Sequence, residues 1–348
     1  MDAQANRFTP AYLSPVPIEP RPGGLPYDLT WAELGSCLPG FTTAEGARAW
    51  VSHEKQGLNK GANSCILTLG YAGRDGSPRE QTVFCKRSED PARAEAAKYA
   101  YLSSREMPTP RLLGVVARDR GEVIVLEFLT TVGIEPYDAD EFLLLIARLN
   151  AVQAPPELFT LPPGMPEERF HARVKAALTT LAGDPGVPVA VDPDRWFAAY
   201  RRAAESIATL PVALNHGELY FQQVGWSVAD GMRRLVMFDL ETMGLRPRFH
   251  DIATVLAGTA TYTGREQRAL FASYLDALAS LTGVMIDETQ AWNEMRLVRT
   301  VMAYQGLPWR IEMLGHQDLT ETLADIARAL HDDLTALGLL ERSTAHLS

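Results

Sequence analysis

The sequence predicts an α+β protein of two lobes, in which a small antiparallel β-rich lobe precedes a larger helical lobe. Up to residue 130, short apolar runs rich in β-branched residues indicate strands. These runs are 64–70, 81–86, 112–117 and 122–129. Beyond Tyr137 apolar residues recur at helical spacing, and only the stretch 212–240 interrupts them with strand-like patterns. We expect a ligand cleft where the two lobes meet.

The first 45 residues are interrupted by proline and glycine, most densely at 20–26. Such a segment favours an extended arm and disfavours long helices and central strands. From Thr42 the pattern TTAEGARAWVSHE predicts a short helix, or a helix that leads into a strand. Asp75-Gly76 then marks a hairpin turn between the first two strand-like runs. The expected domain limits are 1–45 for the arm, 46–130 for the β-rich lobe and 131–348 for the helical lobe.

Asp90-Pro91 is typical of a helix start, and strong helix formers continue to about Ser104. The run 122–129 alternates poorly, which indicates a buried central strand. Periodicity predicts six later helices. They cover 139–152, 166–182, 194–208, 265–282, 287–304 and 318–337.

Composition narrows the class of protein. The chain has 348 residues, is 46% hydrophobic and lacks an uninterrupted run of about 18 apolar residues, so we expect no membrane partner. Its start does not resemble a secretory signal, and its three cysteines include no CxxC pair, which favours the cytoplasm.

Residues 131–348 hold 18 basic and 28 acidic residues, and thus the whole net charge of -10. That acidity argues against nucleic acid as a partner and would attract a cationic substrate. The oligomeric state is not predictable.

The stretch 212–240 holds the strongest functional signal. His216-Gly217-Glu218 and Gln223 precede a strand, an Asp-Gly turn and a second strand that ends at Asp239. If the two strands pair around residue 230, Gln223 faces the neighbourhood of Asp239. Oxygen ligands without sulfur are the kind that Mg²⁺ prefers. The pattern therefore predicts a magnesium site.

In order and spacing these stretches resemble the aminoglycoside phosphotransferase and choline kinase-like superfamily, small-molecule kinases of protein-kinase-like fold. That superfamily carries H-G-D-x-x-x-x-N, a hairpin, an apolar-apolar-D-x-E segment, a glycine, a proline and D-L-A. The matching residues here are His216-Gly217-Glu218 through Gln223, Phe238-Asp239-Leu240-Glu241, Gly244, Pro247 and Asp251-Ile252-Ala253. The resemblance spans roughly residues 50 to 310 and extends forward to Lys86, Glu95, 107–115 and Glu127-Phe128-Leu129.

The resemblance implies a kinase that moves the γ-phosphate of ATP or GTP to a hydroxyl of a small polar metabolite or aminoglycoside-like molecule. Glu218 would be the catalytic base, and His216 would orient the catalytic loop. Asp239 and Gln223 would bind Mg²⁺. Lys86, positioned by Glu95, would hold the phosphates. The loop 57–64, with Gly61, Asn63 and Ser64, would cover the nucleotide, and the backbone from Glu127 to Leu129 would recognise its base.

Glu218 and Gln223 stand where the family has aspartate and asparagine, and each is one methylene longer. Both keep the chemical type, which favours a re-spaced active site. The alternative hypothesis is an inactive or weakly active kinase-like nucleotide-binding protein with a regulatory role. A third hypothesis is nucleotidyl transfer on the same fold.

Two other catalytic motifs are incomplete in this sequence. A zinc deaminase is excluded because no P-C-x-x-C follows the H-x-E triplet. Residues 225–229 approximate a hydrolase nucleophile elbow, but they lie in a predicted hairpin strand and lack its last glycine. The acceptor itself is not encoded in a recognisable motif.

Overall fold

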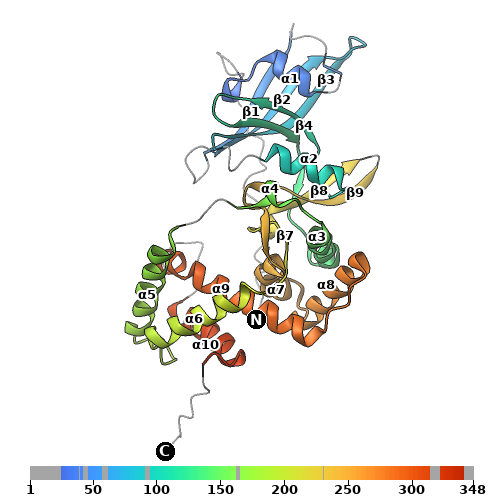
Figure 1. The fold of residues 1–348 in the computed structure, drawn as a ribbon. Helices are drawn as coiled ribbons and strands as arrows, with labels where there is room; N and C mark the ends of the chain where they lie inside the picture. Colours follow the sequence, from blue (N-terminus) through green and yellow to red (C-terminus); the bar gives the residue numbers. More distant parts are fainter. Residues whose placement is uncertain are drawn as a thin grey trace, which may run out of the picture. The chain divides into compact units, whose positions relative to one another are not determined.

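The structure, a computed structural model, describes residues 25–38, 40–41, 46–56, 62–90, 95–161, 165–229, 231–313 and 322–340. Its elements confirm the α+β class, with an antiparallel sheet early in the chain and helices in the later part (Figure 1). The chain forms two compact units. Unit 1 comprises Met1–Val132 and Gly225–Glu241, and unit 2 comprises Gly133–Val224 and Thr242–Ser348. The hairpin of the 212–240 stretch thus belongs to unit 1, the unit that contains the sheet. The domain limits expected from the sequence stay a prediction.

Unit 1 contains a five-stranded antiparallel sheet in the order β1-β2-β3-β5-β4. Its strands are β1 (Arg48–Gln56), β2 (Ala62–Ala72), β3 (Pro78–Ser88), β4 (Leu112–Ala117) and β5 (Glu122–Glu127). Strand β5 lies between two neighbours and its residues from Val123 to Leu126 are buried, as the poor alternation predicts. Gly76 makes the predicted hairpin turn, with a φ of 75°. The stretch for which a helix or helix–strand pattern was expected forms strand β1 within the described residues.

The residues just before the sheet are not an extended arm. After the 3-10 turn η1 (Pro26–Asp28), helix α1 (Trp31–Cys37) begins at Thr30, whose side chain and Glu33 form a capping box. Leu34 and Cys37 are buried with residues of the sheet in one apolar core. The high content of proline and glycine in this region does not predict helix α1. The helix forms because its capping box and the burial of its apolar residues outweigh the composition of the flanking residues.

Two further elements complete unit 1. Helix α2 (Ala96–Ser104) follows β3, and a small sheet has the order β6-β8-β9. Its strands are β6 (Thr131–Val132), β8 (Val224–Ala229) and β9 (Met232–Met237). The predicted hairpin after residue 223 is therefore present, and Asp239 follows its second strand.

Unit 2 is mainly helical. Its longer helices are α3 (Ala139–Ala151), α5 (Glu167–Gly183), α6 (Pro193–Ile207), α7 (His250–Thr263), α8 (Gln267–Thr282), α9 (Glu288–Glu312) and α10 (Leu323–Ala336). Shorter elements are α4 (Pro156–Phe159), the 3-10 turns η3 (Pro136–Asp138) and η4 (Phe221–Gln223), and η5 (Leu240–Thr242) at the unit boundary. Trp196, Tyr200 and Tyr304 lie in its apolar core. In the described part of the chain, no helix combines the length and apolarity that a membrane crossing needs.

A two-stranded sheet positions the residues of the 212–240 stretch that belong to unit 2. Strand β7 (Val212–Asn215) pairs antiparallel with β10 (Gly244–Pro247). Helix α7 follows β10, and the helical periodicity of the sequence does not predict it. Its threonines at 254, 259, 261 and 263 donate to the carbonyl four residues earlier, which satisfies hydroxyls that otherwise disfavour a helix interior.

Candidate active site

In unit 1, the ammonium of Lys86 is surrounded by carboxylates. Lys86 lies on β3, and its Nζ is 2.5 Å from an oxygen of Glu95, 2.5 Å from one of Asp239 and 3.5 Å from one of Glu241. The side chains of Lys86 and Glu95 are 11% and 2% exposed. An ion pair this buried is stable only with close geometry and further hydrogen bonds, and both are present.

Helix α2 holds the segment that carries Asp239. The Leu240 backbone N–H donates to Oε2 of Glu95 (2.8 Å). The Lys98 ammonium, one turn along the helix, donates to the carbonyls of Leu240 (3.0 Å) and Glu241 (2.9 Å). Asp239 has a φ of 65°, a left-handed conformation that costs free energy for a residue with a side chain, so these contacts stabilise a strained backbone.

The electrostatics of this cluster are set by burial and by the three carboxylates. Burial by itself would lower the pKa of Lys86, but the charges of Glu95 and Asp239 raise it above its ordinary value. Burial raises the pKa of Glu95, and the attraction of Lys86 opposes that effect. The attraction of Glu95 and Asp239 outweighs the effect of burial, so the lysine keeps its charge.

The same carboxylates form a possible cation site. Glu95, Asp239 and Glu241 each offer an oxygen atom, and these atoms lie within 4.8 Å of one another. Lys86 pairs with all three carboxylates, and their side chains differ in exposure: 2% for Glu95, 14% for Glu241 and 45% for Asp239. Asp239 is therefore the most accessible of the three oxygen donors. Hard oxygen donors with excess negative charge fit Mg²⁺.

The other expected nucleotide-binding residues of unit 1 are only partly described. Ser64 lies directly opposite Lys86 in the β2–β3 ladder, so the two residues share a face of the sheet. Asn63 pairs with Arg87 in the same ladder. Gly61 and the rest of the loop 57–61 lie outside the described residues.

At the end of β5, the Glu127 backbone N–H donates to the Arg111 carbonyl (2.9 Å). The Glu127 carboxylate accepts the Ser227 hydroxyl (2.5 Å) and the Arg111 N–H (3.2 Å). Leu129 is buried, with 8% exposure. The side chain of Glu127 is therefore committed to contacts within unit 1, and any recognition of a base here would have to come from the backbone.

In unit 2, Asp251 holds the backbone around His216. The carboxylate of Asp251 is fully buried and accepts the N–H groups of His216 (2.6 Å) and Gly217 (2.9 Å). The Asp251 N–H in turn donates to the side chain of Asn215 (3.1 Å). Asn150 of α3 donates to the Leu214 carbonyl (2.7 Å). A carboxylate that accepts two backbone donors is a strong anchor for a loop.

Gly217 allows a close approach that no other residue would. It has a φ of 91°, and a Cβ atom there would lie 2.6 Å from the Arg246 guanidinium and 2.7 Å from the Thr242 carbonyl. Arg246 donates to that carbonyl (3.0 Å), and His250 Nε2 lies 3.4 Å from the Gly217 carbonyl. Burial lowers the pKa of Arg246, whereas the charges of Asp251 and Glu218 oppose the shift. The loop therefore has a positive charge packed against it.

The two residues that depart from the family pattern lie after this anchored backbone. Glu218 is exposed, whereas its neighbours His216 and Leu219 are fully buried. Gln223 ends η4, and its Oε1 accepts the Tyr220 N–H (3.1 Å). Glu218 and Gln223 belong to unit 2, and Asp239 belongs to unit 1.

The structure thus brings Lys86, Glu95 and Asp239 together in unit 1, and places His216, Glu218 and Gln223 on one short stretch of unit 2. Sequence reasoning missed the residues that support them. The supporting residues contact the predicted residues or the residues next to them; they are Lys98, Tyr99 and Glu122 in unit 1 and Asn150, Arg246 and His250 in unit 2. Only Lys98, three residues after Glu95 on the same helix, could have been suggested by spacing.

Comparison with solved structures finds remote similarity to small-molecule kinases. The chain is 12% identical to an ethanolamine kinase from Plasmodium vivax, with 82% of this chain and 80% of that chain covered and a TM-score of 0.48. It is 16% identical to an aminoglycoside-3'-phosphotransferase of type VIII, with 75% and 93% covered and a TM-score of 0.44. An amicoumacin kinase in complex with AMP-PNP, Ca²⁺ and Ami is 13% identical, with 82% and 87% covered and a TM-score of 0.49.

No curated protein sequence matches the chain. A family model, in contrast, matches residues 74–298, which include the Lys86 cluster, the Asp251-anchored loop and the hairpin of the 212–240 stretch. The match covers more than half of the 348 residues. The chain belongs to the APH phosphotransferase enzyme family.

Proposed function

We propose that this protein is a Mg²⁺-dependent kinase that transfers the γ-phosphate of ATP or GTP to a hydroxyl of a small polar metabolite or aminoglycoside-like molecule. The observation that carries the proposal is the Lys86 cluster. A buried lysine paired with a buried glutamate, beside the half-exposed carboxylate of Asp239 and the mostly buried one of Glu241, is suited to phosphates and their metal ion. Membership of a phosphotransferase family supports the same chemistry.

On this proposal Lys86 binds the α and β phosphates, and Glu95 keeps its ammonium in place. Ser64, opposite Lys86 on β2, and Asn63 lie at the base of the loop that covers the nucleotide. The backbone from Glu127 to Leu129 contacts the base. Asp239 would bind Mg²⁺, with Glu241 as a further oxygen donor, and Gln223 would be the ligand that unit 2 supplies. When bound, Mg²⁺ would neutralise phosphate charge.

The acceptor hydroxyl would give its proton to Glu218. A general base must reach its proton within hydrogen-bond distance, so the backbone that carries it must be fixed. Asp251 fixes that backbone at His216 and Gly217, one residue before Glu218. His216 orients the loop through its buried position. Exposure of Glu218 leaves its carboxylate accessible to an acceptor.

The second candidate is a nucleotide-binding protein of low or no activity with a regulatory role, and the observation that motivates it is the added length of Glu218 and Gln223. An added methylene moves each polar group by about 1.5 Å, which is enough to cost about a hundredfold in rate if it is not compensated. Nucleotide binding alone would support both candidates. Turnover separates them.

The first experiment is calorimetric binding of ATP and of GTP, each with and without Mg²⁺, because it requires no known acceptor. We expect Mg²⁺-dependent binding by the native protein and loss of the Mg²⁺ dependence in Asp239→Asn. Asparagine tolerates the left-handed backbone at this position, and Glu95 remains as the ion-pair partner of Lys86, so the substitution preserves the backbone and the main pair of the cluster. Asp119→Asn, at an exposed residue of unit 1, is the matched control. Binding that ignores Mg²⁺ in the native protein would contradict the proposal.

Glu218→Gln tests the catalytic base. We expect it to reduce phosphoryl transfer to a hydroxyl acceptor, found by screening, by about 10²-fold or more while nucleotide affinity stays within about twofold. Full activity in this variant would show that the base lies elsewhere. A native protein that binds nucleotide but phosphorylates none of the acceptors would favour the regulatory candidate.

A further inference from the structure

Glu95 occupies the N-cap position of helix α2 but does not cap it. A side chain at that position usually accepts a backbone N–H of the first helical turn. Here the Glu95 side chain makes no capping bond. One of its oxygens pairs with Lys86 (2.5 Å), and the other accepts the Leu240 N–H (2.8 Å).

A glutamate of strand β5 supplies the acceptor that the Glu95 side chain does not provide. Glu122, the first residue of β5, places Oε1 2.8 Å from the Glu95 N–H and 2.9 Å from the Ala96 N–H. Both donors belong to the start of α2, where the helix offers its N–H groups and the positive end of its dipole. A negative carboxylate there is favourable, and it contacts the backbone of Glu95 directly.

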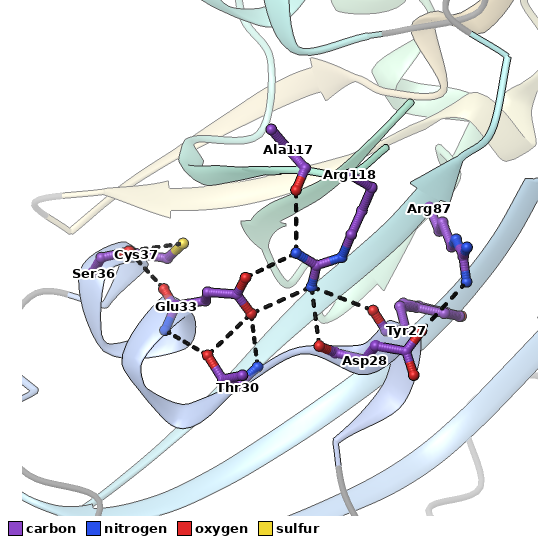
Figure 2. A network of polar contacts seen from close by, with 9 residues as sticks. All are labelled: Tyr27, Asp28, Thr30, Glu33, Ser36, Cys37, Arg87, Ala117 and Arg118. Carbon is purple, nitrogen blue, oxygen red and sulfur yellow. Dashed lines mark hydrogen bonds and ion pairs between the residues drawn. The ribbon is translucent and has the colours of Figure 1, made fainter. Parts of the chain in front are cut away.

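Glu122 is itself held at the end of the sheet. It pairs with Ser88 of β3 and with Ala117 of β4. Gly121, just before it, has a φ of 77°, and a Cβ atom there would lie 1.7 Å from the Ser88 carbonyl, so the turn fits tightly against β3. Arg118, at the start of this turn, donates to Glu33 of α1 (2.8 and 3.3 Å), and Figure 2 shows its contacts.

We propose that Glu122 is a positioning residue of the nucleotide site: its cap on α2 leaves the Glu95 carboxylate available to hold Lys86 and Leu240. This inference rests on the proposed function of Lys86 as a phosphate-binding residue. Without Glu122, the first N–H groups of α2 lack their acceptor, and the nearest alternative is the side chain of the N-cap residue, Glu95. Glu95 would then be drawn towards its own helix and away from Lys86.

The test is a double-mutant cycle in nucleotide affinity, measured by calorimetry with Mg²⁺·ATP and Mg²⁺·GTP. We expect Glu122→Ala to weaken binding about tenfold, the usual scale of a lost cap, and Glu122→Gln to weaken it less because one acceptor oxygen remains. Glu80→Gln, at an exposed residue of β3, is the matched control and should leave affinity unchanged. In a Glu95→Gln background, Glu122→Ala should weaken nucleotide affinity by less than a further twofold, because the Glu95 carboxylate through which Glu122 acts is already removed.

Amide hydrogen exchange tests the cap without any ligand. We expect the Glu95 and Ala96 amides to exchange about tenfold faster in Glu122→Ala than in the native protein. Additive losses of affinity in the double variant, or unchanged exchange at these amides, would overturn the positioning role. A native protein that binds no nucleotide would overturn the proposed function, whereas the exchange comparison would still report on the cap, so the two failures are distinguishable.

Discussion

The Lys86 cluster of unit 1 and the Asp251-anchored loop of unit 2 are built in opposite ways. Around Lys86, charged side chains hold one another, and the paired Lys86 and Glu95 are nearly buried. In the loop, a buried carboxylate holds backbone N–H groups, and the side chain of Glu218 is exposed. The first region therefore depends on side-chain length, whereas the second fixes the main chain and leaves the Glu218 side chain exposed.

This contrast accounts for where the chain departs from its family pattern. Both lengthened residues, Glu218 and Gln223, lie in the stretch whose backbone is held by other groups. Glu218 is exposed and can gain a methylene without repacking, whereas Gln223 is partly buried and its longer side chain accepts the Tyr220 N–H. A change of length at Lys86 or Glu95 would instead break a pair whose oxygen and nitrogen are 2.5 Å apart. Three substitutions test the contrast, in decreasing order of expected effect.

Lys86→Met should cause the largest loss of stability. Methionine replaces the apolar stem of the lysine but leaves the Glu95 carboxylate, 2% exposed, without its cation. Removing one partner of a buried pair costs about 3–5 kcal/mol in the free energy of unfolding. Urea denaturation measures this change. Lys86→Met combined with Glu95→Gln should recover most of it, and a single-variant loss below about 1 kcal/mol would contradict the buried-pair description.

Asp251→Asn should have an intermediate effect confined to the loop. Its amide group can accept from only one of the two N–H donors that the carboxylate now serves, so one of them loses its partner. We expect a loss of about 2 kcal/mol in unfolding free energy and a marked fall in turnover, with Mg²⁺·ATP affinity unchanged. Asp276→Asn, at an exposed position of helix α8, is the control. Equal losses of affinity and turnover would show that the two regions are not independent.

The smallest effect is expected for Gly217→Ala, measured as the difference in unfolding free energy from Gly231→Ala. Both glycines have positive φ, 91° and 74°, so both substitutions incur the left-handed penalty. Only at Gly217 does the added Cβ also meet the Arg246 guanidinium and the Thr242 carbonyl, whereas nothing lies within 4 Å of it at Gly231. The unfolding free energy should therefore fall by about 1 kcal/mol more for Gly217→Ala. Equal losses would mean that both groups move aside freely.

The sequence predicted the parts of this molecule that depend on local pattern. The strands around Lys86, the Asp75-Gly76 turn and the hairpin after Gln223 follow from alternation and turn residues. The resemblance also implied that Lys86 and Glu95 meet, and they do. The roles of these residues in binding and catalysis stay predictions.

The supporting contacts could not be predicted, because they join residues that no local pattern connects. Glu122 is 27 residues from Glu95, and Asn150 is 64 from Leu214. A glutamate at a strand start or an asparagine near a helix end is ordinarily a surface residue. Helix α1 was missed for another reason: the prolines and glycines around it dominate the composition, whereas its capping box and the burial of Leu34 and Cys37 determine the structure.

The docking of α1 on the sheet also decides where the chain can be shortened for expression. A truncation that treats the first 45 residues as a dispensable leader would remove Leu29, Leu34 and Leu38 and uncover the aliphatic surface of the sheet that they now cover. It would also take away the carboxylate and carbonyl acceptors of Arg118 (Figure 2). Such a protein would self-associate through the uncovered surface, so a shortened gene should begin no later than Leu25.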